Sequence, residues 1–287
     1  MGQQCSRGEY TEDVFVIEEV GVTLPARSYT KFGWKKDLPD FRDRVLALLE
    51  GKVANLPAKV DLRPEEKIEI YDQGNLGSCT ANALGAAFHF AQLRHGLQAF
   101  PPSRLFMYYN ERALEGNSDV DSGASLRDGL RSLNRLGVCS EQAWPYDIDK
   151  FTDKPNSELY KAAAKNICLE YARVPQTLAD LKSCINEGFP ISFGFVVLGS
   201  FMTREVARTG VMCMPRANDK VLGGHAVMAC GYDDERKVFL VRNSWSSRWG
   251  DGGYFYMPYD YITWDALAGD FWAMKLVKGQ NFPCKKP

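Results

Sequence analysis

The sequence predicts an α+β protein with two lobes, a helical lobe followed by a lobe of mainly antiparallel strands. Apolar residues recur at helical spacing up to about residue 165, and from about Cys168 they fall into short runs between glycines and charged turns. The length of 287 residues allows one large domain or two modest ones. We therefore expect a functional site in a cleft between the two lobes.

Capping residues and glycines set the expected limits of the individual helices and strands. A short helix would begin after Asp40 and end at Gly51, and later helices are expected at 79–95, from Pro102 or Ser103, at 126–137 and at 157–166. Strands are expected at 14–22, 169–174, 191–197, 226–232, 238–243, 253–257 and 271–277.

The chain divides into an N-terminal segment, 1–55, and a domain, 56–287, because a proline-containing linker begins near Leu56. Within the domain, the helical lobe would cover about 73–165 and the β lobe about 168–277. The N-terminal segment is either a region that covers the cleft or an arm that only packs against the domain.

The composition is typical of a soluble globular protein, with 45% hydrophobic and 25% charged residues. A net charge of −1 gives no reason to expect nucleic acid or an anionic membrane as a partner. No membrane span and no signal peptide are visible, so the location, cytoplasm or export, stays open. We expect the protein to be a monomer. The first residues match a myristoylation pattern at Gly2, with Cys5 as a possible second acylation site. Because the pattern is short, we favour an unmodified polar terminus.

Eight cysteines occur without a single CxxC pair, which argues against structural zinc, and we expect neither a metal nor a cofactor. If Cys79 is a free nucleophile, at least one of the other seven must also be unpaired. Three cysteines lie in apolar runs and are expected in the core, namely Cys168, Cys184 and Cys230.

Cys79 is the candidate nucleophile because it begins the helix expected at 79–95. The unpaired N–H groups and the dipole at a helix N-terminus favour a thiolate, which is the reactive form of cysteine. A histidine is the usual proton partner of such a thiolate.

Helix geometry leaves His225 as the only candidate partner among three histidines. His89 and His95 follow on the same helix, roughly 15 and 24 Å up the axis from Cys79, too far to touch it. Asn243 follows His225 after a strand, and its side-chain oxygen could orient the imidazole ring. A neighbouring indole, that of Trp245, could shield this contact, although a tryptophan beside glycines is also ordinary core packing.

Several short motifs together resemble the papain/cathepsin family of cysteine peptidases. Gln73 stands six residues before the cysteine of GSC, and GHAV, NSW and WGxxGY follow in that order between Asp61 and Val277. The resemblance implies a papain-like fold, with a helical left lobe, a β-barrel-like right lobe and the active site between them.

Carried over by residue, the resemblance makes Cys79 the nucleophile, His225 its proton partner and Asn243 the residue that orients the ring. Gln73 would donate to the oxyanion, together with the backbone N–H of Cys79. A thiolate–imidazolium pair is the expected resting state. Substrate-binding residues would come from the cleft loop and from the surroundings of the histidine, namely Gly123, Ala124, Gly224, Ala226 and Trp245.

Three departures from the family pattern affect the cleft wall rather than the catalytic groups. Leu76 replaces a disulfide cysteine, which is typical of bacterial-type relatives, Thr80 replaces an aromatic residue, and Gly224 stands where many relatives carry aspartate.

The sequence therefore predicts a cysteine endopeptidase that hydrolyses polypeptides through an acyl-enzyme, with its N-terminal segment as a possible zymogen-type inhibitor. A binding module that has lost catalysis and an enzyme that transfers the acyl group to an amine remain the alternatives. The first would lack one catalytic group, and added amines would change the products of the second.

Overall fold

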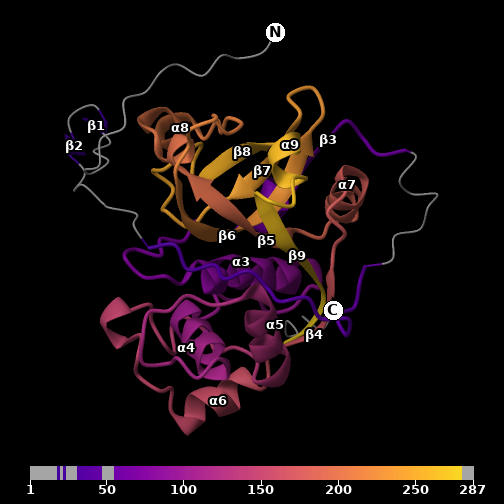
Figure 1. Ribbon diagram of the computed structural model, residues 1–287. Helices are drawn as coiled ribbons and strands as arrows, with labels where there is room; N and C mark the ends of the chain where they lie inside the picture. The colour runs from indigo at the N-terminus through magenta and orange to yellow at the C-terminus, as the bar shows by residue number, and fades with distance from the viewer. Residues whose placement is uncertain (1–17, 20–21, 24–30, 47–54, 280–287) are drawn as a thin grey trace.

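The computed structural model describes residues 18–19, 22–23, 31–46 and 55–279, and these form two lobes with one long helix between them (Figure 1). The central helix, α3 (Cys79–Arg94), lies between the sheet and the other helices of the first half. Almost all of its residues are buried, because both lobes pack on it. This arrangement confirms the predicted two-lobe α+β fold.

The β lobe is built on one seven-stranded sheet in which every pair of neighbours is antiparallel. The strand order is β4-β9-β5-β6-β7-β8, with β3 added to β6, and the sheet is open rather than closed into a barrel. The strands are β3 (Lys59–Asp61), β4 (Ile167–Arg173), β5 (Ile191–Leu198), β6 (Val221–Asp233), β7 (Val238–Arg242), β8 (Tyr254–Pro258) and β9 (Ala268–Lys278).

The helical lobe contains α4 (Arg104–Leu114), α5 (Leu126–Arg135), η1 (Ile148–Lys150) and α6 (Ser157–Ala163), and short helices flank the sheet. Side chains cap the helix N-termini, for example Ser103, whose Oγ accepts from the N–H of Phe106 at 3.2 Å. The remaining helices are α2 (Arg63–Glu66), α7 (Leu178–Asn186), η2 (Gly199–Met202), α8 (Arg204–Thr209) and α9 (Tyr259–Ile262).

The predicted helix after Asp40 is wrong over its described part. Residues 41–43 form a turn, and Val45 makes a bridge to Arg173 at the end of β4. The backbone N–H of Leu46 donates to the carbonyl of Arg173 at 2.7 Å, so pairing with a strand replaces the helical hydrogen bonds. Residues 47–54 lie outside the described part of the chain.

Two elements near the sheet differ from the sequence prediction. β6 begins at Val221, well before the expected residue 226, because Gly223 and Gly224 pair with β5. α7 was not predicted, although Thr177 caps it and accepts from the N–H of Asp180 at 3.1 Å. At the N-terminus, β1 (Glu18–Glu19) pairs with β2 (Val22–Thr23), while the rest of the expected strand at 14–22 and both acylation candidates lie outside the described residues.

The N-terminal arm, which we define as residues 31–46, runs along the junction of the two lobes. The N–H of Trp34 donates to the carbonyl of Gly224 in the β lobe at 2.9 Å. The N–H of Lys35 donates to the carbonyl of Ala124 in the helical lobe at 3.0 Å. The arm therefore contacts both walls of the junction at the same place.

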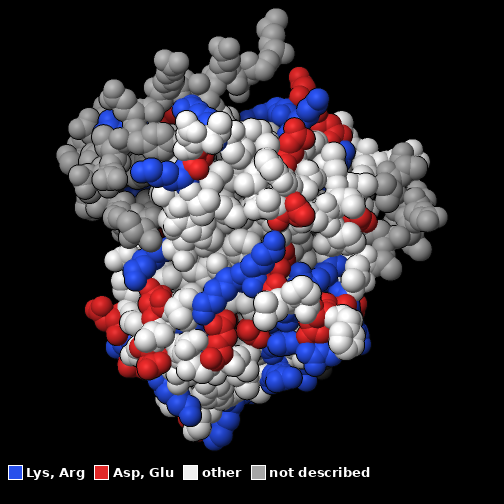
Figure 2. All heavy atoms as spheres, viewed as in Figure 1, with Lys and Arg blue, Asp and Glu red and all other residues white. Residues whose placement is uncertain are grey.

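Charged side chains of both signs are interspersed on the face shown in Figure 2, mostly over the helical lobe. In the described part of the chain, no helix is long and apolar enough to cross a membrane. The free, buried cysteines there include the three predicted core residues, and the full set is Cys79, Cys139, Cys168, Cys184 and Cys230.

Candidate active site

Cys79 is the first residue of α3, as predicted, and its side chain has no solvent exposure. The N-cap residue, Ser78, makes no side-chain cap hydrogen bond, so the first N–H groups of the helix are not taken by it. The backbone of Ala226, the residue that follows His225, is one of the groups that act to lower the pKa of the thiol. The structure thereby brings the start of α3 against the middle of β6.

His225 and Asn243 contact each other directly. Nε2 of His225 lies 2.8 Å from Oδ1 of Asn243, the residue immediately after β7. The N–H of Ser244 donates to the same Oδ1 at 2.8 Å, which identifies this atom as the amide oxygen. Nε2 therefore carries the proton, and Nδ1, which has no hydrogen-bond partner among the described residues, keeps its lone pair.

Trp245 stacks on the imidazole of His225, with ring centroids 4.8 Å apart and an interplanar angle of 23°. The indole is buried and also contacts the aromatic rings of Phe201 and Trp249. This packing keeps water away from the bond between His225 and Asn243.

The Gln73 side chain is buried and oriented by Ser244. Its Oε1 accepts from Ser244 Oγ at 2.7 Å, which leaves Nε2 on the other side of the amide as the donor. Nε2 donates to the carbonyl of Leu76 at 3.0 Å and to the carbonyl of Lys31 in the arm at 3.3 Å. The predicted oxyanion donor thus already binds a peptide carbonyl.

The arm passes close to the thiol at Gly33, whose backbone is another group that acts to lower the pKa of Cys79. The carbonyl of Gly33 accepts from the N–H of Ala124 at 2.8 Å. A Cβ on Gly33 would lie 1.7 Å from the carbonyl oxygen of Gly77, and a Cβ on Gly123 would lie 2.2 Å from the oxygen of Gly33. Only glycines permit this close approach of the arm to the cleft.

Trp34 packs on the β side of the junction, and we refer to the surroundings of its indole, Gly194, Gly224 and Asp270, as the Trp34 pocket. A Cβ on Gly194 or Gly224 would lie 1.9 or 2.7 Å from its indole, which accounts for glycine where relatives carry aspartate. The indole Nε1 donates to Oδ2 of Asp270 at 3.1 Å, so the floor of the pocket is acidic. Asp270 has a φ of 57°, a strained backbone conformation for a residue other than glycine.

Burial acts against the expected thiolate–imidazolium pair while the arm is in place. Burial raises the pKa of the Cys79 thiol to about 11, although backbone hydrogen bonds, including that of Gly33, act in the opposite direction. Burial lowers the pKa of His225 to about 4, against the effect of its hydrogen bond to Asn243. Both shifts favour the neutral thiol and the neutral imidazole over the expected thiolate–imidazolium pair while the arm is seated.

The other departures from the family pattern are buried packing residues. Leu76 has 3% exposure and lies in the core. Thr80 is fully buried, and its Oγ1 donates to Oε2 of Glu111 in α4 at 2.6 Å. Burial raises the pKa of Glu111 to about 8, and its remaining oxygen, Oε1, has no hydrogen-bond partner among the described residues.

The nine residues predicted for the cleft, four catalytic and five on the substrate side, all border the junction of the lobes. Ala124 and Gly224 bind the backbone of the arm there, and the ring centroids of Trp245 and Phe32 are 6.4 Å apart. Sequence reasoning allowed that part of residues 1–55 covers the cleft, but it did not identify residues 31–35, and it left the place of Asp270 open. The only signal for the former was the glycine between two aromatic residues in FGW. Nothing local marked Asp270, because its place depends on the sheet.

Comparison with known proteins is consistent with this geometry. The family described as papain family cysteine protease matches residues 56–263. A peptidase C1-like protein of Acanthamoeba polyphaga mimivirus is 44% identical over 272 residues, which cover 86% of this chain and 87% of the viral protein. A pro-cathepsin H of Medicago truncatula is 28% identical over 84% of this chain and 70% of its own length.

Solved structures show the same fold. The crystal structure of xylellain, a cysteine protease from the bacterium Xylella fastidiosa, has a TM-score of 0.81 and 42% identity, covering 90% of this chain and 99% of xylellain. The likeness to bacterial-type relatives is thereby confirmed. A procathepsin B of Trypanosoma congolense has a TM-score of 0.66 at 17% identity over 85% of this chain and 86% of its own, a likeness of fold alone. The family match, which spans most of the chain, shows that the protein belongs to the papain family of cysteine peptidases.

Proposed function

We propose that the protein is an endopeptidase in which Cys79 is the nucleophile and His225 its proton partner. The observation that carries this proposal is the contact of His225 Nε2 with Asn243 Oδ1 at 2.8 Å, because it leaves Nδ1 with a free lone pair that can take a proton. The thiol at the start of α3 would supply that proton.

The reaction proceeds in two stages. The Cys79 thiol gives its proton to Nδ1 of His225, and the sulfur attacks the carbonyl carbon of the scissile peptide. Nε2 of Gln73 and the backbone N–H of Cys79 donate to the oxyanion. The imidazolium then protonates the departing amine, and a water molecule activated by His225 hydrolyses the acyl-enzyme.

The arm supports the choice of endopeptidase over exopeptidase. The arm, residues 31–46, crosses the junction of the lobes as an internal part of the chain, since β2 precedes it and β3 follows it in the sequence. Its backbone bonds to Ala124 and Gly224, two of the predicted substrate-binding residues. A site that accommodates the middle of a chain in this way needs no free terminus.

We also propose that the arm inhibits the enzyme in cis, as the name pro-cathepsin implies for one relative. Cys79 and His225 have no solvent exposure while the arm is seated, and Lys31 holds the donor that an oxyanion would need. Substrate can bind only after the arm leaves. Action as a monomer without nucleic acid stays a prediction.

Replacement of the nucleophile tests the catalytic assignment. In a full-length chain whose cleft is opened by Gly33→Ala, the further change Cys79→Ala should abolish the hydrolysis of fluorogenic peptides, and no thiol-directed epoxide should label residue 79. Cys139→Ala, which removes another free and buried cysteine, is the matched control in the same opened chain and should leave its activity unchanged. Residual hydrolysis by Cys79→Ala would show that another group is the nucleophile.

A further inference from the structure

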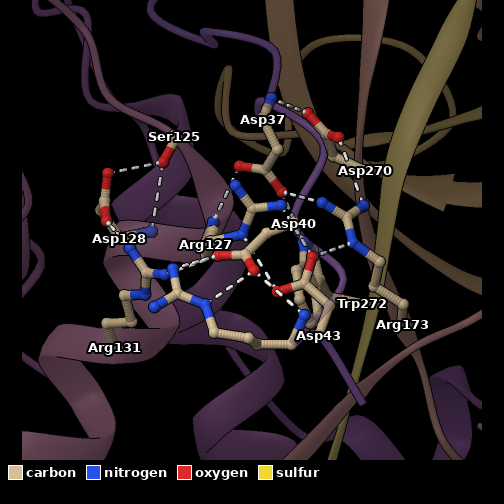
Figure 3. A network of polar contacts seen from close by, with 11 residues as sticks. Asp37, Asp40, Asp43, Ser125, Arg127, Asp128, Arg131, Arg173, Asp270 and Trp272 are labelled. Atoms are coloured by element: carbon tan, nitrogen blue, oxygen red, sulfur yellow. Dashed lines mark hydrogen bonds and ion pairs between the residues drawn. The ribbon is translucent and has the colours of Figure 1, made fainter. Parts of the chain in front are cut away.

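Beside the cleft, donors from the two lobes form a binding site for a carboxylate. Oδ2 of Asp37 accepts from Nη2 of Arg173 at 2.8 Å and from the indole N–H of Trp272 at 3.0 Å (Figure 3). Oδ1 accepts from the backbone N–H of Arg127, in the first turn of α5, at 3.2 Å. The Asp37 side chain has no solvent exposure, so three kinds of donor converge on a fully desolvated anion.

A second carboxylate site adjoins the first. Nε and Nη2 of Arg127 donate to the two oxygens of Asp43 at 3.1 and 2.7 Å, a bidentate arrangement. Nε of Arg173 donates to the same side chain at 2.6 Å. At the edge, Nη2 of Arg131 lies 3.3 Å from Oδ2 of Asp40. We refer to Arg127, Arg131, Arg173 and Trp272 as the arginine cradle.

The carboxylates and the arginines belong to different parts of the molecule. All three aspartates are in the arm, whereas the cradle comes from α5, β4 and β9. When the arm leaves, the acids that remain within reach are Asp128, 3.3 Å from Arg131, and Asp270, 3.4 Å from Arg173. Three guanidinium groups would then face two carboxylates.

Arg127 is the group most affected by departure of the arm. In the described part of the chain, its side chain forms ion pairs with Asp43 alone, and the residue is 7% exposed. Once the arm has left, this guanidinium keeps its charge and its planar fork of donors but has lost the carboxylate that they bind. The emptied cradle therefore favours binding of another carboxylate.

The cradle is continuous with the cleft. Trp34 occupies the pocket beside the active site, and Asp37 follows it by three residues, a span of about 10 Å in an extended chain. Any polypeptide that places a side chain in this pocket can reach the cradle without leaving the surface. The arm therefore indicates where a second recognition element of a bound chain would lie.

We propose that the arginine cradle is a binding site for acidic side chains of polypeptide substrates. The enzyme would select chains that carry a carboxylate about three residues from the residue in the Trp34 pocket, in whichever direction the substrate runs. This inference rests on the proposed peptidase function, because only a peptidase would have the bound chain as its substrate. The binding of an acidic peptide can nevertheless be measured without catalysis.

The test uses the full-length chain with Cys79→Ala, Gly33→Ala, Asp37→Asn and Asp43→Asn, which prevents cleavage, unseats the arm and removes its two buried carboxylates. Fluorescence anisotropy would measure the affinity for labelled peptides of alanine and glycine that contain one tryptophan. One peptide carries aspartate three residues after the tryptophan, another three residues before it, and each has a matched peptide with asparagine. Thermal melting of every variant verifies that it is folded.

We expect one aspartate peptide to bind about tenfold more tightly than its asparagine match at low salt, as one hydrogen-bonded charge pair predicts. The preference should disappear in Arg173→Gln and should persist in Arg135→Gln, an exposed arginine at the other end of α5. Equal binding of the aspartate and asparagine peptides would overturn the proposal, and so would a preference that Arg173→Gln leaves intact. Repeating the series with Cys79 restored separates the two proposals, because selective binding without cleavage would refute the peptidase function alone.

Discussion

Gly33→Ala is the smallest change that should open the cleft. The added methyl group would lie 1.7 Å from the carbonyl oxygen of Gly77 and 2.4 Å from its carbonyl carbon, both backbone atoms that cannot rotate away. The backbone of residue 33 does not have a positive φ, so alanine is compatible with its conformation and the effect is steric. The arm must move out by more than an ångström to relieve this contact.

Such a movement breaks three backbone hydrogen bonds of the arm at once. These are Ala124 N–H to Gly33 at 2.8 Å, Trp34 N–H to Gly224 at 2.9 Å and Lys35 N–H to Ala124 at 3.0 Å. At about 0.5–1.5 kcal/mol each, their loss destabilises the closed state by about 1.5–4.5 kcal/mol. Each 1.4 kcal/mol is a factor of ten, so the open population should rise roughly 10- to 1,000-fold.

The rate at which iodoacetamide labels Cys79 reports this population, because the thiol has no exposure in the closed state. Peptide hydrolysis should rise in parallel. Gly269→Ala is the matched control, since its Cβ would meet only the end of the Lys36 side chain at 3.5 Å. If Gly33→Ala labels no faster than the wild type while its melting temperature is unchanged, the arm does not control access to the thiol.

Three further predictions concern charge and orientation. Burial lowers the pKa of His225 to about 4 in the closed state, so as the pH falls from about 6.5 toward 4 the imidazole binds a proton more readily in the open state, and the closed state is destabilised relative to the open state by about 3 kcal/mol. Hydrogen exchange of the amides at 33–35, corrected for intrinsic rates, should therefore accelerate over that interval, and a flat profile would refute the linkage. Asn243→Ala should lower kcat about 10- to 100-fold in a chain opened at residue 33, because the ring loses the contact that fixes its tautomer, with little change in KM. Arg242→Ala leaves Glu66 buried without the ion pair that joins Arg242 Nη1 to Glu66 Oε1 at 2.9 Å in the native protein. The free energy of unfolding, measured by thermal melting, should fall by about 3–5 kcal/mol. Arg135→Ala, at the surface, should change it by less than about 0.5 kcal/mol.

The parts of the fold that the sequence predicted are those governed by local pattern. The central helix was placed within a residue of its observed end, because Gly96 and the start at Cys79 bound a continuous apolar stretch. The strands were found because their apolar runs are short and separated by turns. The order of cysteine, histidine and asparagine along the chain was enough to indicate the family, although their roles remain predictions.

The arm could not be predicted in this way because its conformation depends on distant partners. The apolar residues after Asp40 have helical spacing, yet the backbone of Leu46 bonds to Arg173, which is far away in the sequence. Asp37 likewise has no local partner that would mark it as buried. Such residues are determined by tertiary contacts, which local propensity does not encode.

The same limitation applies to the predicted resting charge state. A thiol at a helix N-terminus is expected to ionise, and that expectation treats the cleft as accessible to water. With the arm seated, burial outweighs the helix terminus and the hydrogen bonds, so the pKa of Cys79 rises to about 11. The two charge states therefore belong to two positions of the arm.

One departure from the family pattern, Gly224, shares a physical cause with two other glycines of the cleft, Gly33 and Gly123. An aspartate in place of Gly224, as in many relatives, would put its Cβ 2.7 Å from both the backbone and the ring of Trp34. A side chain at Gly33 would meet the residue two before the nucleophile, and one at Gly123 would meet Gly33 itself. Because each of these three glycines is required by the seated arm, the glycine at 224 is a consequence of closure, and Gly224→Asp should open the cleft as Gly33→Ala does.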